Sequence, residues 1–131
     1  MKKVLMDTYA WIEYLEGSEK GEKVKEVLED ETDTYTALVS VAELADAFHR
    51  GDVETKFDWQ EILDYIQLNS VIVELNEEGM ASAGTLKVKR REEFDDFGLM
   101  DAIILESSRK VGAKLMTGDP HLTGEDNSIA L

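Results

Sequence analysis

Short apolar runs alternate along the chain with longer segments of helical periodicity. Four runs have the length and residue types of buried strands, and they occupy residues 4–6, 34–39, 71–75 and 114–117. Between and around them, apolar residues three and four positions apart predict helices at residues 9–15, 19–28, 41–48, 59–68, 76–89 and 99–111. A last short strand is predicted around Ile129. This alternation is typical of an α/β fold, in which helices cover both faces of a central, mainly parallel sheet.

Glycines mark several of the predicted helix ends. Gly17 and Gly112 each follow the last apolar position of a helical segment, where glycine commonly ends a helix. Gly79 and Gly84 instead interrupt the segment 76–89, at a cost of about 1 kcal/mol each. This segment is therefore the most weakly encoded of the helices.

Length and composition indicate a single domain over residues 1–131. The chain is 43% hydrophobic, and no linker or repeat divides it. No apolar run approaches the roughly 18 residues that cross a bilayer, and the N-terminus lacks the pattern of a signal peptide. The absence of cysteine excludes disulfides and cysteine-ligated zinc. We expect a cytoplasmic protein with no membrane partner.

The chain is strongly acidic. Its 29 Asp and Glu residues against 14 Lys and Arg residues give a net charge of −15. Such a surface repels polyanions, so the charge alone argues against nucleic acid as a partner. Any function that acts on a phosphodiester therefore needs bound cations.

Four acidic residues lie where a solvated surface does not explain them. Asp7 ends the first strand, Asp119 follows the fourth, and Glu43 and Asp101 fall in the predicted first turns of two helices. In an open parallel sheet, ligands bind outside the carboxyl ends of the strands, so we expect these carboxylates to share that edge. Crowded carboxylates repel one another unless a hard cation such as Mg²⁺ or Mn²⁺ compensates. Such an ion lowers the pKa of a bound water and neutralises charge on a phosphoryl oxygen.

Three of the four acids also have structural interpretations. Asp7 would serve as a helix N-cap. Residues 40–43 match the S-x-x-E capping box, which would occupy Glu43 in a local hydrogen bond. Asp119 precedes a proline, which is typical of a turn or a helix start. Asp101 differs, because its neighbours at helical spacing are apolar, so its buried carboxylate requires a cation or hydrogen-bond donors.

Two threonines stand beside these acids. Thr8 follows Asp7, and Thr117 lies two residues before Asp119. Their hydroxyls could orient a water or a carboxylate, and helix capping or strand propensity explains them equally well.

Four motifs in sequence order resemble those of PIN-domain ribonucleases, most closely the VapC-type toxins of prokaryotic toxin–antitoxin pairs. The motifs are VLMDTYAWIEYL from Val4, S-x-x-E-L from Ser40, GLMDAIILESSRKVGAKLMTGD from Gly98, and the closing PHL. The resemblance implies a PIN-like three-layer α/β/α sandwich. It also implies an endoribonuclease that depends on Mg²⁺, with Mn²⁺ as a substitute.

The resemblance further implies roles for individual residues. Asp7, Glu43, Asp101 and Asp119 match the acidic quartet of the family, and Thr117 matches its hydroxyl position. We expect Asp7 and Asp101 to contact the metal directly. Glu43 and Asp119 would bind it directly, bind it through water, or help to activate the attacking water.

Partners follow from the same resemblance. Members of the family usually form homodimers, and a small antitoxin protein inhibits them by inserting into the acidic groove, often with an arginine. We expect both partners here, because a surface of −15 suits a basic antitoxin segment.

The densest basic stretch is KVKRR, at residues 87–91. Cationic side chains are needed to hold the RNA backbone near the metal, although a short charge run is also typical of a solvated helix end. The candidates are Lys87, Lys89, Arg90 and Arg91, with Lys110 and Lys114 as further ones.

The two histidines have structural interpretations. His49 lies near a helix end, where it interacts favourably with the helix dipole. His121 follows Asp119 by two residues, but the family pattern assigns it no fixed catalytic role.

Other functions compete with a ribonuclease. A phosphotransferase of the haloacid dehalogenase type requires D-x-D, but position 9 is Tyr. A receiver domain requires a phospho-accepting Asp after its middle strand, but residues 71–75 are followed by Asn76. A catalytically inert PIN-fold binding module remains the alternative, and it predicts no Mn²⁺ binding and no effect of Asp7→Asn or Asp101→Asn.

Overall fold

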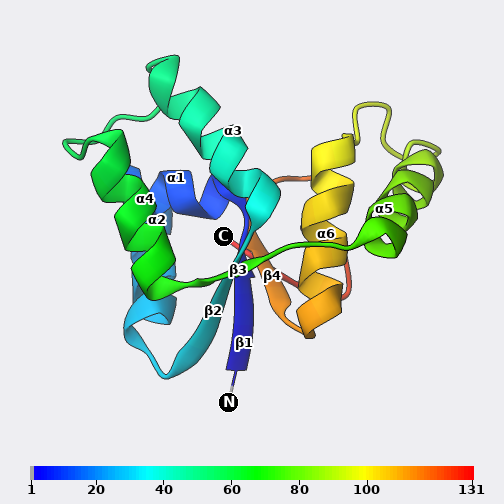
Figure 1. The fold of residues 1–131 in the computed structure, drawn as a ribbon, viewed down its shortest axis with the longest axis horizontal. Helices are drawn as coiled ribbons and strands as arrows, with labels where there is room; N and C mark the ends of the chain where they lie inside the picture. Colours follow the sequence, from blue (N-terminus) through cyan, green and yellow to red (C-terminus); the bar gives the residue numbers. More distant parts are fainter. Residues whose placement is uncertain (1) are drawn as a thin grey trace.

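A five-stranded parallel sheet forms the centre of the molecule (Figure 1). The structure is a computed structural model that describes residues 2–131. Its strands are β1 (Lys2–Met6), β2 (Thr32–Ala37), β3 (Val71–Val73), β4 (Lys114–Thr117) and β5 (Ser128–Ala130). They pair in parallel in the order β3-β2-β1-β4-β5, which confirms the predicted sheet and the last strand around Ile129.

Helices cover both faces of this sheet. They are α1 (Thr8–Glu16), α2 (Glu19–Glu29), α3 (Leu38–His49), α4 (Trp59–Asn69), α5 (Glu77–Arg90) and α6 (Leu99–Val111). In Figure 1, α1, α2 and α4 lie on one side of the strands, and α5 and α6 lie on the other. The predicted three-layer α/β/α sandwich is therefore confirmed. Within residues 2–131, no helix combines the length and apolarity needed to cross a bilayer.

Two hydrophobic clusters fill the space between the layers. Successive residues of β1 point to opposite faces, as the pleat of a strand requires. Leu5 therefore packs with α5 and α6, whereas Val4 and Met6 pack with the helices on the other face. The indole Nε1 of Trp11, buried in the second cluster, donates a 3.0 Å hydrogen bond to Thr36 Oγ1 on β2. This contact fixes α1, and with it the start of the helix next to Asp7, against the sheet.

The most weakly encoded helix forms as predicted. Asn76 caps α5 by accepting a 2.9 Å hydrogen bond from the Gly79 amide, which offsets part of the cost of the glycines in this segment. Gly17 and Gly112 end α1 and α6 with φ of 67°, a left-handed conformation that glycine adopts without steric strain.

The junction between β2 and α3 differs from the prediction. The strand ends at Ala37 and the helix begins at Leu38, although the pattern predicts a strand to residue 39 and a helix from residue 41. Burial decides the outcome, because Ser40 must be helical for its side chain to lie fully buried in the first turn of α3. The predicted capping box is wrong: Ala37 is the N-cap, and no side chain caps the helix. Glu43 consequently lies in the second turn rather than the first.

Candidate metal centre

The order of the strands determines where a ligand site is expected. From β1 the chain proceeds to β2 and β3 on one side, and it then returns through α5 and α6 to β4 on the other side of β1. From the carboxyl ends of the neighbouring strands β1 and β4, the chain therefore continues toward opposite edges of the sheet. The crevice between two such strand ends is the usual position of ligand sites in these folds. Asp7 directly follows β1, and its amide donates a 3.2 Å hydrogen bond to the Met116 carbonyl of β4.

Asp7 is almost completely buried at this junction, with 3% of its surface exposed. It is the N-cap of α1, as the sequence predicts, and Oδ1 accepts a 2.7 Å hydrogen bond from the Ala10 amide. The pKa of Asp7 is raised from 3.8 to about 7, chiefly by burial, and the charges of Asp119 and Glu43 contribute in the same direction. Hydrogen bonds from Thr117 and Ala10 oppose this rise. The cap is therefore present, but it satisfies only part of the charge of a buried carboxylate.

Glu43 reaches the same region from α3. Its half-buried carboxylate accepts a 2.6 Å hydrogen bond from Thr8 Oγ1, which links α3 to the first turn of α1. Burial raises the pKa of Glu43, the Thr8 hydrogen bond lowers it, and the charges of Asp101 and Asp119 raise it. Because the capping box does not form, this carboxylate is not occupied at the start of its own helix.

Asp101 extends from the first turn of α6. Its Oδ2 accepts a 3.0 Å hydrogen bond from the Gly98 amide, which supplies the donor that a half-buried carboxylate requires. Burial raises the pKa of Asp101, and the charge of Asp119 contributes in the same direction. The hydrogen bond from Gly98 lowers it, and a positive charge on His121 acts in the same direction.

Asp119 lies in a turn two residues beyond β4. Its amide donates a 3.0 Å hydrogen bond to Oγ1 of Thr117, a fully buried residue, and its Oδ1 accepts a 2.9 Å hydrogen bond from the His121 amide. The amides of Leu122 and Thr123 both bond to the Asp119 carbonyl, and the chain makes a turn here that does not continue as a helix. Thr117 thus contacts the Asp119 backbone and the Asp7 side chain.

Charges on all four carboxylates interact. The charges of Asp119 and Glu43 raise the pKa of Asp7, and those of Asp101 and Asp119 raise the pKa of Glu43. The charges of the four predicted acids therefore interact, although the residues are separated by up to 112 positions in sequence. Among residues 2–131, the acids whose ligand atoms lie within 4.8 Å of one another in a group of three or more are Asp101 and Asp119, and Asp7 and Glu43 lie outside that group. Carboxylate oxygens whose negative charges are not balanced by nearby cations are typical ligands of Mg²⁺ or Mn²⁺. Metal binding by these residues stays a prediction.

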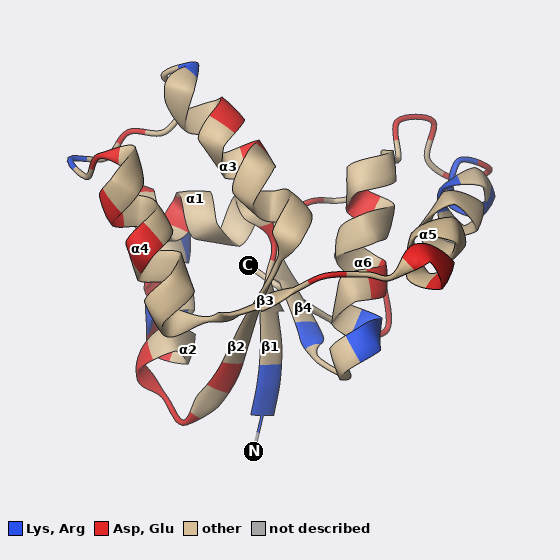
Figure 2. Ribbon diagram, viewed as in Figure 1, with Lys and Arg blue, Asp and Glu red and all other residues tan. Residues whose placement is uncertain are grey.

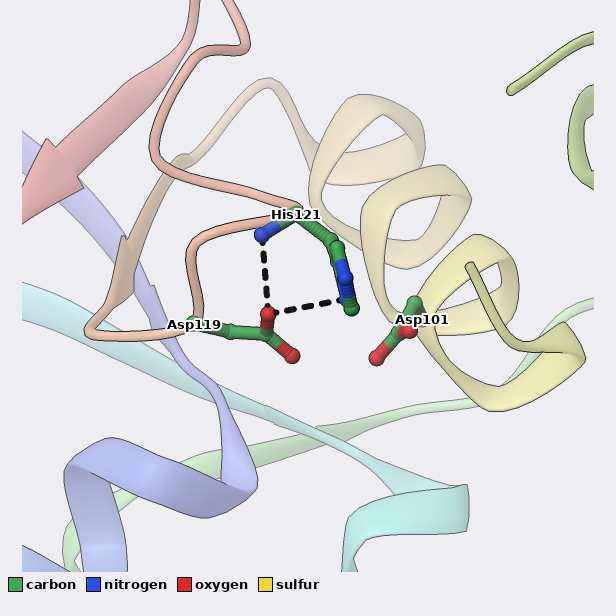
Figure 3. A group of neighbouring side chains, drawn as sticks. All are labelled: Asp101, Asp119 and His121. Atoms are coloured by element: carbon green, nitrogen blue, oxygen red, sulfur yellow. Dashed lines mark hydrogen bonds and ion pairs between the residues drawn. The ribbon is translucent and has the colours of Figure 1, made fainter. Parts of the chain in front are cut away.

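His121 is a member of this group that sequence reasoning did not select. Figure 3 shows Asp119 and His121 on one segment facing Asp101 on α6. One ligand atom from each of these three residues lies within 4.8 Å of the other two. The spacing of two residues from Asp119 was visible in the sequence, but the direction of the ring depends on the turn and on packing.

The basic run lies at the C-terminal end of α5, at the right of Figure 2. Arg90 forms an ion pair with Glu125, and Arg91 Nε donates a 2.6 Å hydrogen bond to the Phe97 carbonyl. Among residues 2–131, neither Lys87 nor Lys89 has a side-chain hydrogen bond or ion pair. The two lysines are therefore the members of the run that remain available to a ligand.

The two further basic candidates lie away from the acids. Lys110 is in the last turn of α6, whereas Asp101 is in its first turn. Lys114 begins β4, whereas the acids gather at the carboxyl ends of the strands. Because a helix of this length spans about 20 Å, Lys110 and Lys114 are placed at the wrong end of the molecule to guide RNA toward the acids.

Comparison with known proteins identifies related folds. The profile of the family described as PIN domain matches residues 4–123. A toxin–antitoxin complex from Klebsiella pneumoniae contains a chain of similar structure, 18% identical, with a TM-score of 0.72 over 97% of this chain and 96% of that one. None of the curated proteins compared with the sequence matches it.

Two further solved structures share the fold. VapBC2 from Rickettsia felis, bound to a DNA fragment from its promoter, is 14% identical with a TM-score of 0.70 over 98% of this chain and 97% of that one. VapC20 from Mycobacterium tuberculosis, a Sarcin-Ricin loop cleaving toxin, is 14% identical with a TM-score of 0.67 over 92% of this chain and 95% of that one. At these identities the structures show a common fold, while the family profile spans most of the sequence. The chain belongs to the PIN-domain family.

Proposed function

We propose that this PIN-domain protein is a Mg²⁺- or Mn²⁺-dependent endoribonuclease and the toxin of a toxin–antitoxin pair. One observation carries the proposal: four carboxylates from distant segments, Asp7, Glu43, Asp101 and Asp119, lie close enough for their charges to interact. Within residues 2–131, no Lys or Arg side chain forms an ion pair with any of them. A divalent cation supplies the compensation that this arrangement lacks.

The donor set fits a hard divalent ion. Asp7 and Asp101 would hold it directly, and Glu43 and Asp119 would bind it directly, bind it through water, or help to activate the attacking water. When bound, the ion supplies a water of lowered pKa and neutralises the charge that develops on a phosphoryl oxygen. Thr117 orients Asp7 through its hydroxyl, and Thr8 holds Glu43 in place.

RNA must approach this centre against a net charge of −15. Lys87 and Lys89 provide cationic groups on α5 that have no protein partner among the described residues, and we assign them to the RNA backbone. Arg90 and Arg91 can contribute charge to the same surface, although their side chains also have contacts within the protein. Positive charge is thereby gathered at the C-terminal end of α5, while the strongly acidic remainder of the chain repels RNA.

The toxin role rests on the relatives of this fold. Chains of similar structure come from toxin–antitoxin complexes of several bacteria, among them FitAB, which was solved with a DNA fragment. A small basic antitoxin would suit the acidic centre of this chain, since an inserted arginine would replace the missing cation. We also infer a homodimer, as is usual for the family.

Expression in a bacterial host tests this function. The intact chain is expected to arrest growth and degrade RNA, and Asp7→Asn is expected to abolish both effects. Asp64→Asn, which removes an exposed carboxylate on α4, is the matched control and should leave both effects intact. Co-expression of a small reading frame adjacent to the gene is expected to relieve the arrest. Unaffected growth and intact RNA, while folded protein accumulates, would contradict the proposal and favour an inert binding module.

A further inference from the structure

The imidazole of His121 lies between two carboxylates. Its Nε2 is 2.8 Å from Asp96 Oδ1, and its Nδ1 is 3.2 Å from Asp119 Oδ1. The ring also packs against Phe94 and Phe97, with ring centroids 5.6 Å and 6.4 Å away. Packing and the Asp96 contact therefore hold the ring in one orientation, with Nδ1 directed toward the acidic group (Figure 3).

In its neutral form, which is the form that binds metals, the imidazole has no hydrogen left for Nδ1 to donate. A neutral imidazole carries one N–H, and the shorter contact assigns this hydrogen to Nε2, which donates it to Asp96. The lone pair of Nδ1 then faces Asp119 Oδ1, an acceptor that already receives the His121 amide. Two acceptors at this distance repel each other unless a proton or a metal ion lies beside both.

This arrangement matches that of a metal-binding histidine. Histidine ligands usually donate their second ring N–H to a carboxylate, which fixes the tautomer and the direction of the ring. Asp96 is in the position of that outer carboxylate. The ligand atoms of Asp101, Asp119 and His121 lie within 4.8 Å of one another, so the three side chains can converge on one ion.

We propose that His121 Nδ1 is a nitrogen ligand of the ion held by Asp101 and Asp119, and that it makes the centre select Mn²⁺ over Mg²⁺. Imidazole suits first-row transition metals, whereas Mg²⁺ strongly prefers oxygen ligands. This inference rests on the metal centre of the proposed function and departs from its all-carboxylate ligand set. It predicts that His121→Asn weakens Mn²⁺ binding at least tenfold and changes Mg²⁺ binding less than threefold.

Pulsed electron paramagnetic resonance of the Mn²⁺-loaded protein tests the ligand directly. A nitrogen ligand produces a hyperfine coupling to Mn²⁺, and this coupling changes when the protein is labelled with ¹⁵N-histidine. The labelled chain is otherwise unaltered, so this measurement does not depend on the folding of a variant. The chain has two histidines, so His49→Asn is the matched control that assigns the signal.

The outcomes separate this inference from the proposed function. A histidine-nitrogen coupling that His49→Asn retains and His121→Asn removes, together with the tenfold loss in calorimetry, supports the ligand. Mn²⁺ binding without such a coupling overturns the ligand and leaves the ribonuclease proposal in place. A coupling without any cleavage of RNA supports the ligand and counts against the ribonuclease. The absence of Mn²⁺ binding at millimolar concentration overturns both.

Discussion

Arg90 and Glu125 form a two-pronged ion pair, with Nε 2.9 Å from Oε2 and Nη2 2.9 Å from Oε1. The pair joins the end of α5 to the segment that follows Asp119 and His121, and Arg109 of α6 also reaches Oε1 at 3.3 Å. The Glu125 side chain is only 11% exposed, so its charge depends on these partners. The segment that carries two members of the candidate metal centre is therefore anchored to both helices of one layer.

The first prediction concerns this anchor. Arg90→Ala leaves Glu125 partly buried with one weaker partner, so the free energy of unfolding should fall by about 1–3 kcal/mol. Urea denaturation measures the loss. Arg50→Ala is the control, because its pairs with Asp46 and Asp52 are exposed and should contribute less than about 1 kcal/mol. Equal losses in the two variants would contradict the structural role of Arg90.

Gly118 provides a second prediction, since it separates Thr117 from Asp119. A Cβ at this position would lie 2.2 Å from Tyr9 Cε1, so the Tyr9 ring or the turn must move. Gly118→Ala should therefore weaken Mn²⁺ binding, by roughly tenfold if displaced ligands cost about 1.4 kcal/mol. Calorimetric titration measures the change. Gly124→Ala is the matched control, because no atom lies within 4 Å of its added Cβ. Unchanged affinity in Gly118→Ala would show that Tyr9 yields without disturbing the ligands.

The third prediction separates RNA guidance from general charge. Reversing Lys87 and Lys89 to Glu should weaken RNA binding and flatten the dependence of log Kd on log salt concentration by about 1.4, because two phosphate contacts are lost. Fluorescence anisotropy with a metal-free protein and a short single-stranded RNA measures both quantities. The control is Lys2→Glu combined with Lys114→Glu, which changes the net charge by the same amount but at the amino ends of β1 and β4. If both double variants behave alike, α5 has no specific role.

The fourth prediction is a pH dependence of the metal-free protein. The pKa of Asp7 is about 7 in the fold against an ordinary value of 3.8, so the folded state binds the proton more tightly than the unfolded state. Asp7 therefore favours folding at low pH, and this contribution is lost as the pH rises from about 4 to 7. Between pH 5 and 8 the free energy of unfolding should fall by roughly 2–3 kcal/mol more in the natural protein than in Asp7→Asn.

Asparagine suits this comparison because it also caps helices well. Urea denaturation in a chelating buffer at several pH values measures the difference, since contributions from the other carboxylates largely cancel between the two proteins. Burial raises the pKa of Glu43 and Asp101 in the same direction, so both proteins should still lose stability toward high pH. Identical pH profiles for the two proteins would contradict a strained, buried Asp7 carboxylate.

The sequence predicts the layers of this fold well because periodicity reports burial. The run at residues 114–117 and the helix over residues 99–111 occur as predicted, and Gly112 separates them in the expected left-handed conformation. The start of α3 is predicted wrongly, since Ser40 resembles a cap in sequence but is buried inside the helix. A local motif cannot show whether packing leaves its first residue at the surface.

In the candidate metal centre too, some positions can be predicted from the sequence and others depend on packing. The positions of Asp7 and Asp119 follow from strand ends, which the apolar runs locate. The distance between His121 and Asp96 does not, because it depends on a turn after β4 and on the segment between α5 and α6. The sequence therefore identifies the acids as candidate ligands but gives His121 only a structural interpretation. In the structure, its ring lies beside Asp119 and Asp101.

Cleavage of a labelled RNA by the purified protein tests the central claim most directly. With Mn²⁺ present, the natural protein should cleave the RNA, and a chelator should stop the reaction. Asp7→Asn and Asp101→Asn should lower the rate by at least 100-fold while circular dichroism shows them folded, and Asp64→Asn should cleave normally. Cleavage that persists with the chelator or in folded Asp7→Asn, or no cleavage by a natural protein that binds Mn²⁺, would contradict a metal-dependent ribonuclease built on these carboxylates.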